Sequence, residues 1–491
     1  MTRSRLLFYL LLLTPLLVYW PTIFHDYGWR DDYSYLREAR EEPGKILAGT
    51  SSHGRPLYGA LLETSFEQVG QVENLVWVRL LTVLLLTALA LALWQQLLRS
   101  GWNEAEAAAI GLGLVLLPAA QVISGWATSW PCVVALLLAL AGFSAIETEL
   151  GFGGLKRIIA LVGGALIYAL AGLIYPSNAM FAVVPIAAVL LVRSPRDTIS
   201  PMRWLVVHLS ALFLGLLGSY VLVKLSFASG LFDASPRIQF ETNPFTKLIW
   251  FLGNPLPNSA ALIALRDSFG EGATLFWLTA LLVLGMIAFA WKLLPNPGSK
   301  RSWLICVAGL PFVAHAVSLV AAERVIGYRV LFALSGLVLV LLVFTFRLLR
   351  ESNRLHRNAE HGILAVLVLL ALLAARKNAV TLIAEPQGHE WTIARHAVQR
   401  NAFKGATKVY LIRASLADRS TARVFADEFG SLSSSSDWAP REMFKAALYD
   451  RFGGLLPKGV TVDITVGETP PAPGAFDVVV DFRQLKARRV D

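Results

Sequence analysis

Residues Leu6–Trp20 have the sequence LLFYLLLLTPLLVYW, and a short connection then leads to Asp26–Tyr33, DYGWRDDY. The first run, continued to about residue 24, is long enough to cross a bilayer as a helix. The second run places two adjacent carboxylates, Asp31 and Asp32, directly after that span. A charge near hydrocarbon is costly, so ionisable residues at this position are functional candidates. The alternative is a solvated loop or a helix N-cap, which acidic side chains favour.

The composition indicates a polytopic membrane protein. Of the 491 residues, 55% are hydrophobic and only 16% are charged, whereas about a quarter are charged in soluble domains. The mean hydropathy is +0.57. The net charge of +10 would suit nucleic-acid binding, but basic cytoplasmic loops produce the same balance. Cys132 and Cys306 fall inside or at the ends of apolar runs, so no disulfide framework is expected.

Apolar runs of spanning length recur along the chain. We predict about eleven transmembrane helices, near residues 6–24, 74–98, 104–123, 129–146, 157–175, 178–193, 203–228, 273–293, 302–321, 326–348 and 361–383. Alternate connections support this count, because one set carries Lys or Arg whereas Gln121–Trp130 and Tyr175–Asn178 carry neither. By the positive-inside rule the N-terminus is then cytoplasmic. No A-x-A cleavage site follows the first run, so we expect it to remain as a transmembrane helix.

Basic residues on the predicted outer face depart from this bias and are candidates for binding an anion. They are Arg30, Arg55, Arg237, Lys247, Arg266, Arg324 and Arg329. On the same face, Tyr33–Leu47 and Leu57–Val69 have apolar residues at helical spacing, which predicts two surface helices. Their apolar faces could lie in the membrane interface or dock on protein. The outer connection Ser229–Gly272 is too long for a simple turn, and long ordered loops are often functional.

The composition changes after about residue 384. We predict strands at 408–413, 460–466 and 476–482, and helices at 390–403 and 441–452. Ser431–Ser436 is predicted to be a flexible linker. The chain is therefore divided into a transmembrane domain, residues 1–383, and a small α/β domain, residues 384–491, on the outer side. The second domain contains no phosphate loop, Rossmann glycine fingerprint or zinc-ligand spacing.

An Asp pair at a membrane surface, beside aromatic and basic side chains, suits the reaction of a lipid-phosphate donor. A basic side chain neutralises the leaving phosphate, and a carboxylate removes the proton from an attacking hydroxyl. Water-poor surroundings raise the basicity of the carboxylate and strengthen an arginine–phosphate contact. The residue types on this face therefore predict a group transfer from a lipid phosphate.

The order of three motifs resembles that of a known family. Trp29-Arg-Asp-Asp-Tyr33 follows the first span, Gly54-Arg-Pro-Leu57 comes next, and Tyr175-Pro176 lies at an outer turn. This pattern is similar to the GtrII-like bacterial glucosyltransferases, which are polyprenyl-phosphate-dependent glycosyltransferases of the GT-C fold, and the resemblance extends over most of the membrane part.

The resemblance implies a multi-pass enzyme of the bacterial inner membrane with a periplasmic C-terminal domain. Such an enzyme takes a sugar, here a hexose such as glucose, from an undecaprenyl-phosphate carrier on the periplasmic face. It transfers that sugar to a surface polysaccharide, such as the O-antigen of lipopolysaccharide, or to a lipid-linked acceptor. The implied partners are the polyprenyl-phosphate-sugar donor, a polysaccharide or glycolipid acceptor and membrane lipids, with no nucleic acid.

The resemblance also assigns roles by position. Asp31 falls where GT-C enzymes place the catalytic acid of the first loop, so it is the implied general base. Asp32 would orient Asp31, bind acceptor hydroxyls or bind a metal, with a helix N-cap as the alternative. The implied substrate-binding residues are Trp29, Arg30, Tyr33, His53, Arg55, Tyr175, Arg324 and Arg329. Structural alternatives stay open: Arg55 could pair with an aspartate, Tyr175 could be an interfacial anchor, and Glu323 could pair with a neighbouring arginine.

One departure from the pattern concerns the second outer loop. Gln121–Trp130 has no carboxylate, whereas some related enzymes, such as the aminoarabinose transferases, have an acid there. We therefore predict a mechanism without a cofactor, and a divalent metal is the alternative. Other functions stay open: a transporter or flippase of lipid-linked sugars, which would need polar midplane residues or broken helices, a non-catalytic scaffold, and a polysaccharide polymerase or ligase.

Overall fold

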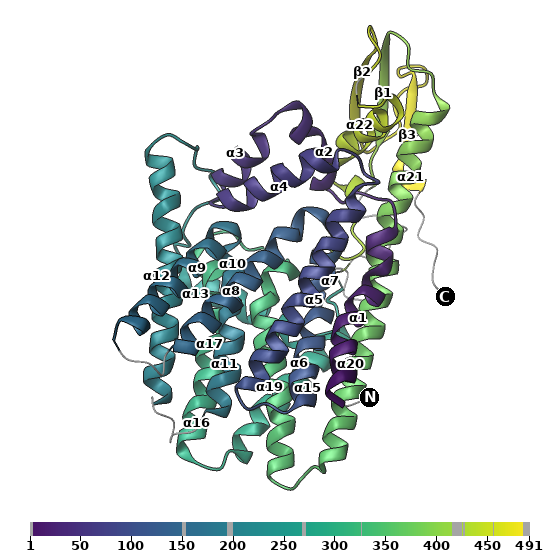
Figure 1. Cartoon of the computed structure of the whole chain (residues 1–491). Helices are drawn as coiled ribbons and strands as arrows, with labels where there is room; N and C mark the ends of the chain where they lie inside the picture. Colours follow the sequence, from purple (N-terminus) through teal and green to yellow (C-terminus); the bar gives the residue numbers. More distant parts are fainter. Residues whose placement is uncertain are drawn as a thin grey trace.

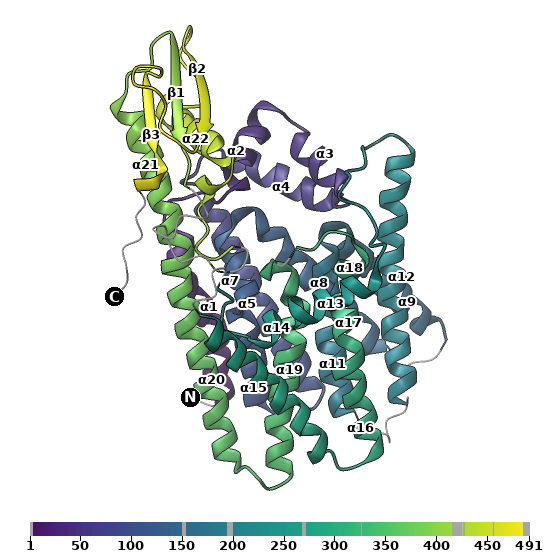
Figure 2. The same cartoon turned by 180° about the vertical axis from the view of Figure 1, so that it is seen from behind.

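The computed structural model describes residues 3–149, 154–193, 200–267, 272–325, 327–414, 425, 428–454 and 456–484. A bundle of long helices forms the main body, and short helices and a small sheet lie together at one end (Figures 1 and 2). Within the described ranges, eight helical segments are long and apolar enough to cross a membrane. They are α1 (Arg3–Phe24), α5 (Leu75–Arg99), η1–α8 (Ala127–Glu149), α9 (Leu155–Ile174), α12 (Pro201–Ala228), α15–η3 (Ala273–Leu293), η5–α19 (Tyr328–Glu351) and the run Arg357–Arg400.

A ninth span is possible if one bent pair of helices is counted. Helices α6 (Glu104–Leu116) and α7 (Pro118–Gly125) meet at an angle of 50°. Leu117 between them is extended, with φ −62° and ψ 155°, because the ring of Pro118 disfavours the helical conformation in the residue before it. The bend therefore follows from the local sequence.

Two of the eleven predicted spans are short or broken in the structure. Residues 178–193 fall in the apolar stretch Pro176–Val192, which consists of α10 (Pro176–Ala179), η2 (Met180–Ala182) and α11 (Val183–Val192). Residues 302–321 are divided among α16 (Pro297–Leu304), the π-helical turn η4 (Ile305–Gly309), α17 (Leu310–Ala314) and α18 (Ala316–Val320). Pro311 lacks the N–H that would continue a regular α-helix here. The predicted helical polytopic class is confirmed, with eight or nine candidate spans.

Three short helices cover one end of the bundle, which we call the outer end. They are α2 (Asp31–Glu41), α3 (Lys45–Ser52) and α4 (Pro56–Val69), and Figure 1 shows them beside the C-terminal unit. Their apolar side chains dock on protein: Tyr33, Leu36, Ile46, Leu62 and Phe66 are each at most 5% exposed. Of the two alternatives for these amphipathic stretches, the structure shows docking on protein.

The C-terminal unit is a small parallel sheet packed with two helices, as the sequence predicts. The strands β1 (Ala406–Ile412), β2 (Thr461–Gly467) and β3 (Val478–Asp481) are ordered β2-β1-β3. Helices α21 (Glu385–Arg400) and α22 (Ala439–Phe452) contact each other and the sheet, and α22 also contacts α2. The run of α20 (Arg357–Asn378), the π-turn η6 (Ala379–Ala384) and α21 joins this unit to the bundle without a break.

The prediction of a flexible linker at Ser431–Ser436 is wrong. This segment contains the 3₁₀ turn η7 (Ser433–Ser435), and Ser431, Ser433 and Ser434 are at most 1% exposed. The turn is ordered because side chains of α21 satisfy its polar groups: Glu390 accepts hydrogen bonds from the N–H groups of Ser433 and Ser434 at 2.8 and 2.9 Å. A serine-rich composition indicates flexibility only where such partners are absent.

Candidate active site

Asp31 starts α2 at the outer end and is half-buried. Its carboxyl group forms no hydrogen bond or ion pair with any residue that the structure describes. Burial raises the pKa of Asp31, because the charged carboxylate loses hydration. The positive charges that oppose this rise come, in falling order, from Arg329, Arg30, Arg237 and Arg55. The structure thus brings arginines from four separate segments around the predicted base.

Asp32 is fully buried and holds two backbone segments together. Its Oδ2 accepts a hydrogen bond from the N–H of Trp29, and its Oδ1 accepts one from the N–H of Thr128, both at 2.9 Å. Burial raises the pKa of Asp32 to about 7. Both oxygens accept hydrogen bonds from backbone N–H groups. These contacts resemble those of a structural carboxylate, such as a helix N-cap, more than those of a ligand-binding group.

Arg79 is a part of this site that the sequence analysis missed. It lies in α5, is 1% exposed, and has Nη2 at 3.9 Å from Oδ2 of Asp32. It donates to the carbonyl oxygens of His25, at 3.2 Å, and Tyr27, and its guanidinium lies 3.7 Å from the centre of the Tyr27 ring. One charge in an apolar span is hidden when hydropathy is averaged, but an arginine there is itself a signal of function.

Trp29, two residues before Asp31, is part of an aromatic pair. The rings of Trp29 and Trp126 are stacked with centroids 5.4 Å apart. The guanidinium of Arg329 lies 4.4 Å from the Trp126 ring, a cation–π distance, and its Nε is 3.9 Å from Oε1 of Glu428 in the C-terminal unit. Glu428 is the acidic partner of Arg329 here, and no local sequence pattern indicates this pairing.

Two residues predicted to bind substrate are fully buried instead. Trp29 and Tyr33 are both 0% exposed. The hydroxyl oxygen of Tyr33 accepts a hydrogen bond from the N–H of Gly28 at 3.1 Å, and its ring lies 5.8 Å from that of Trp391. In this structure these side chains support the backbone around Asp31 and present no surface to a ligand.

Arg55 directly precedes α4 and lies beside two tyrosine rings, whose centroids are 5.7 Å apart. Its guanidinium is 5.0 Å from the centre of the Tyr175 ring and 6.0 Å from that of Tyr58. Among the described residues it forms no ion pair, so the alternative of pairing with Asp31 or Asp32 is not observed. The hydroxyl of Tyr58 donates to the carbonyl of Thr128 at 2.7 Å. Thr128 is thus held by both Tyr58 and Asp32.

Arg324 and His53 were also predicted to bind substrate. Arg324 is 42% exposed on its side chain and pairs with Glu241 at 3.2 Å, whereas Glu323 was the expected partner in the structural alternative. His53 follows α3 and is half-buried. Burial lowers the pKa of His53, and the charges of Arg55 and Arg237 lower it further.

Arg30 connects the site to the C-terminal unit. Its backbone N–H donates to Oγ of Ser433 and its Nη2 donates to Oγ of Ser431, each at 2.9 Å. Arg30 has φ 47° and ψ −104°, a conformation that is strained for a residue with a side chain. These partners are about four hundred residues away in sequence, so no local pattern indicates them.

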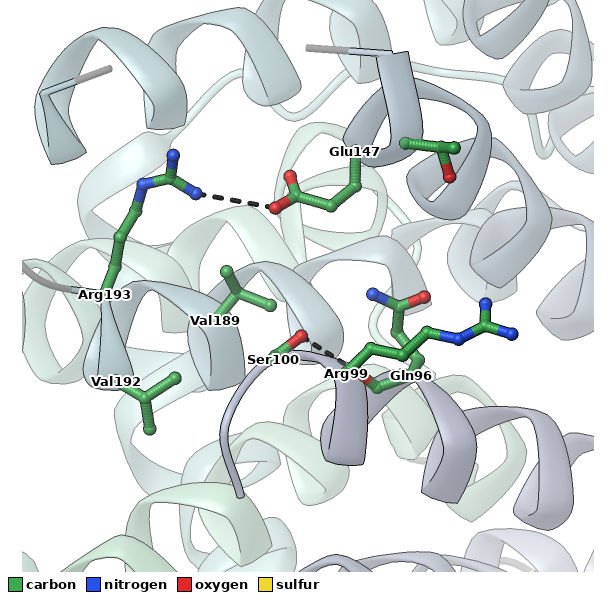
Figure 3. Close-up of a pocket in the computed structure, with 8 residues that line it drawn as sticks. Gln96, Arg99, Ser100, Glu147, Val189, Val192 and Arg193 are labelled. Atoms are coloured by element: carbon green, nitrogen blue, oxygen red, sulfur yellow. Dashed lines mark hydrogen bonds and ion pairs between the residues drawn. The ribbon is translucent and has the colours of Figure 1, made fainter. Parts of the chain in front are cut away.

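A second polar cluster lies at the opposite end of the bundle, where α5, α8 and α11 end around a cavity of about 410 Å³ (Figure 3). Glu147 there pairs with Arg193 at 3.4 Å. The same carboxylate accepts a hydrogen bond from Nε1 of Trp204 at 2.6 Å and contacts Nε2 of His208 at 3.0 Å. Within the described ranges, no group of three or more His, Cys, Asp and Glu side chains is arranged to hold a metal ion at either end.

The fold and site together define a multi-pass helical membrane protein with a polar site at its outer end. No protein-family model matches the sequence, and no curated protein matches it significantly.

Some solved structures are similar in fold. The chain is similar to crystal structures of the Archaeoglobus fulgidus oligosaccharyltransferase in the apo form (TM-score 0.43, 11% identity, covering 91% of this chain and 64% of that chain) and in complex with Zn and sulfate (TM-score 0.41, 11% identity, 91% and 61%). It is also similar to the archaeal oligosaccharyltransferase AglB from the same organism in complex with an inhibitory peptide and a dolichol-phosphate (TM-score 0.41, 11% identity, 91% and 63%). The chain therefore spans less than two thirds of the length of these proteins, and at these scores the likeness assigns no residue role or activity to it.

Proposed function

We propose that the protein is an integral membrane glycosyltransferase of the GT-C type that takes a sugar from a polyprenyl-phosphate carrier. The observation that carries this proposal is the Asp31 carboxyl group, which has no bonded partner among the described residues and lies in the positive field of four arginines. A carboxyl group that is only structural is normally paired when it is buried. A free carboxyl beside several guanidinium groups suits a proton acceptor next to a phosphate site.

The proposed reaction is a single inverting displacement. The acceptor hydroxyl gives its proton to Asp31 while its oxygen forms a bond to the anomeric carbon. The bond from that carbon to the phosphate oxygen breaks, and the carrier leaves as a polyprenyl phosphate. Burial raises the pKa of Asp31 and so brings it nearer to the working pH, where a general base is most effective.

In this proposal the arginines bind the phosphate of the donor. Arg329 exerts the strongest of the opposing charges on Asp31, and Arg55 lies beside the rings of Tyr175 and Tyr58. Guanidinium groups form charge-assisted hydrogen bonds to phosphate oxygens, and the departing phosphate gains charge as the bond breaks. Arg324, already paired with Glu241 at the surface, and His53 take a lesser part in this proposal.

Asp32 acts as a positioning residue in this proposal. By binding the N–H groups of Trp29 and Thr128 it fixes the first turn of α2, where Asp31 lies, against the loop before α8. Both of its oxygens are occupied in this way. We therefore keep the prediction of a reaction without a cofactor, in which no step needs a metal held by Asp32.

The donor and the location follow from the family resemblance. We propose an undecaprenyl-phosphate hexose such as the glucose derivative, an acceptor that is a surface polysaccharide such as the O-antigen or a lipid-linked glycan, and a bacterial inner membrane. The N-terminus is then cytoplasmic, and the outer end with residues 384–491 is periplasmic. The division at residues 383 and 384 remains a proposal, since α20 and α21 form one continuous helical run across it.

The test is sugar transfer to the surface polysaccharide by wild type, Asp31→Asn and Asp26→Asn at equal amounts in the membrane. Asp26 is an exposed carboxylate in the same connection, so it is a matched control. We expect Asp31→Asn to lose a factor of about 10²–10⁴ in rate, the usual contribution of a general base, and Asp26→Asn to stay within twofold of wild type. Full activity of Asp31→Asn would remove the proposal.

A transporter or flippase of lipid-linked sugars is the second candidate. The bent pair α6–α7 and the interrupted helices α16–α18 favour it, because transporters place their sites at broken helices. It predicts that Asp31→Asn moves the lipid-linked sugar across the membrane as wild type does. Loss of sugar transfer in Asp31→Asn, with the donor lipid still reaching the outer leaflet, would exclude this candidate.

A further inference from the structure

One turn of the C-terminal unit contacts Arg329 and Arg30, the two arginines whose charges act most strongly on Asp31. We define this turn as Glu428–Ser434. Its first residue, Glu428, accepts a hydrogen bond from the N–H of Tyr328 at 3.3 Å and pairs with Arg329 at 3.9 Å. Its serines bind Arg30. The turn therefore touches both chain segments that carry these arginines.

The contact with Arg30 is made to the backbone as well as to the side chain. Ser433 Oγ accepts the N–H of Arg30, the residue that directly precedes Asp31. Because Arg30 has φ 47°, its conformation is strained and persists only where the surroundings hold it. The hydrogen bond from its N–H is a contact that would be lost if the residue relaxed to a common conformation. Ser433 thus fixes the direction in which α2 and Asp31 begin.

Ser433 is itself held in place from α21. Its hydroxyl donates to Oε1 of Gln387 at 2.6 Å, which leaves the oxygen lone pairs free to accept the N–H of Arg30. Its own N–H donates to Glu390 at 2.8 Å. Ser433, Gln387 and Glu390 are all 0% exposed. The hydroxyl hydrogen and the backbone N–H of Ser433 therefore each have one defined acceptor. The hydrogen bonds run from α21 through Ser433 to Arg30.

We propose that the Glu428–Ser434 turn is a positioning element of the active site, in which Ser433 sets the conformation of Arg30 and so the orientation of Asp31. This inference rests on the proposed function of Asp31 as the base. It assigns the C-terminal unit a part in the transfer step itself. In this proposal the C-terminal unit forms the outer side of the active site.

The test compares Ser433→Ala with Ser435→Ala in the full-length protein in lipid nanodiscs. Ser435 directly follows this turn, and among the described residues its hydroxyl donates to the carbonyl of Leu432 alone, so it controls for loss of a serine. We expect amide hydrogen exchange in Trp29–Tyr33 to rise about tenfold in Ser433→Ala, since one hydrogen bond is worth about that factor, and to stay at the wild-type rate in Ser435→Ala. Exchange in α22 should not change in either variant.

The kinetic arm separates positioning from binding. In sugar transfer we expect kcat of Ser433→Ala to fall about tenfold, with KM for the lipid donor within twofold of wild type and Ser435→Ala unchanged. Wild-type exchange at Trp29–Tyr33 in Ser433→Ala would overturn the inference, as would a rise in exchange throughout α22, which would indicate that the unit had unfolded. Asp31→Asn in the same assay keeps the two proposals apart: if it transfers sugar normally, the proposed function fails, whatever the exchange shows.

Discussion

The helix bundle carries a carboxylate among basic residues at each of its ends. At the end shown in Figure 3, Glu147 has three partners: Arg193, Trp204 and His208. At the outer end, Asp31 lies in the field of four arginines but bonds to none of the described residues. The two sites have similar residue types, but the Glu147 carboxylate is paired whereas the Asp31 carboxyl group has no bonded partner among the described residues.

In the proposed function, this difference separates a structural ion pair from a site that binds a ligand. The desolvation cost of a buried charge is offset only when its partners are well placed. The partners of Glu147 are well placed. Around Asp31 the guanidinium groups are held by other contacts instead: Arg329 by Glu428 and Trp126, and Arg30 by Ser431. The positive field is therefore kept in place without neutralising the carboxylate, and an anionic ligand can complete the arrangement.

The sharpest way to break the comparison is to neutralise each carboxylate in turn. We expect Asp31→Asn to lower sugar transfer by about three orders of magnitude while the free energy of unfolding stays equal or rises, because a buried charge without a bonded partner is removed. Glu147→Gln should leave the transfer rate within twofold. Transfer assays and thermal unfolding on the same preparations measure both quantities. Lower stability in Asp31→Asn would mean that its carboxylate is structural after all.

A second comparison is between two arginines of the predicted site. Arg329 lies on the Trp126 ring and exerts the strongest of the charges that oppose the pKa rise of Asp31, whereas Arg324 is exposed and paired with Glu241. We expect Arg329→Ala to weaken binding of undecaprenyl phosphate about 50-fold, as loss of a charge-assisted contact would, and Arg324→Ala to weaken it less than threefold. Equal effects of the two substitutions would show that only the total charge of the outer end matters.

The third prediction concerns the paired end. Glu147→Ala leaves the Trp204 N–H, the His208 ring and Arg193 without their shared acceptor, so we expect the free energy of unfolding to fall by about 2 kcal/mol. Thr148→Ala on the same helix is the control, because its hydroxyl donates only to the carbonyl of Ser144. A melting temperature equal to that of the control would show that the cluster around Glu147 adds nothing to stability.

The sequence predicted those features that depend on local composition. Apolar length indicated most of the helices, since a bilayer demands it, and the carboxylates at the end of the first span were conspicuous for the same reason. The three predicted spans that differ are the one bent at Leu117 and Pro118 and the two interrupted or shortened near Pro176 and Pro311. The strands and helices of the C-terminal unit followed from patterning and from the Gly453 at the end of α22.

The rest of the site depends on contacts between distant residues. Ser433 is separated from Arg30 by 403 positions and Thr128 from Asp32 by 96. The serine-rich segment is flexible in isolation and becomes ordered only when Glu390 and Gln387 satisfy it. Local sequence therefore indicates Asp31 as a candidate base, but the residues that position it can be identified only in the folded chain.

The last prediction tests the second carboxylate of the pair. Burial raises the pKa of Asp32 to about 7 from 3.8, so between about pH 4 and pH 7 the folded protein binds more protons at this site than the unfolded chain. The contribution of Asp32 to stability therefore falls as pH rises through this window, by at most about 1.4 kcal/mol per pH unit, and levels off above it.

Asp32→Asn should remove this slope. The amide also has one acceptor oxygen for the two N–H groups of Trp29 and Thr128, which adds a pH-independent loss of stability to this pH-dependent difference. The measurement is the difference in unfolding free energy between wild type and Asp32→Asn at pH 5, 6, 7 and 8, with Asp26→Asn as the control for an exposed carboxylate. A difference that does not change with pH would mean that Asp32 stays ionised in the fold. Arg79, at 3.9 Å from Oδ2, would then outweigh the desolvation of the carboxylate, and the Asp32 site would resemble the paired Glu147 rather than the open Asp31.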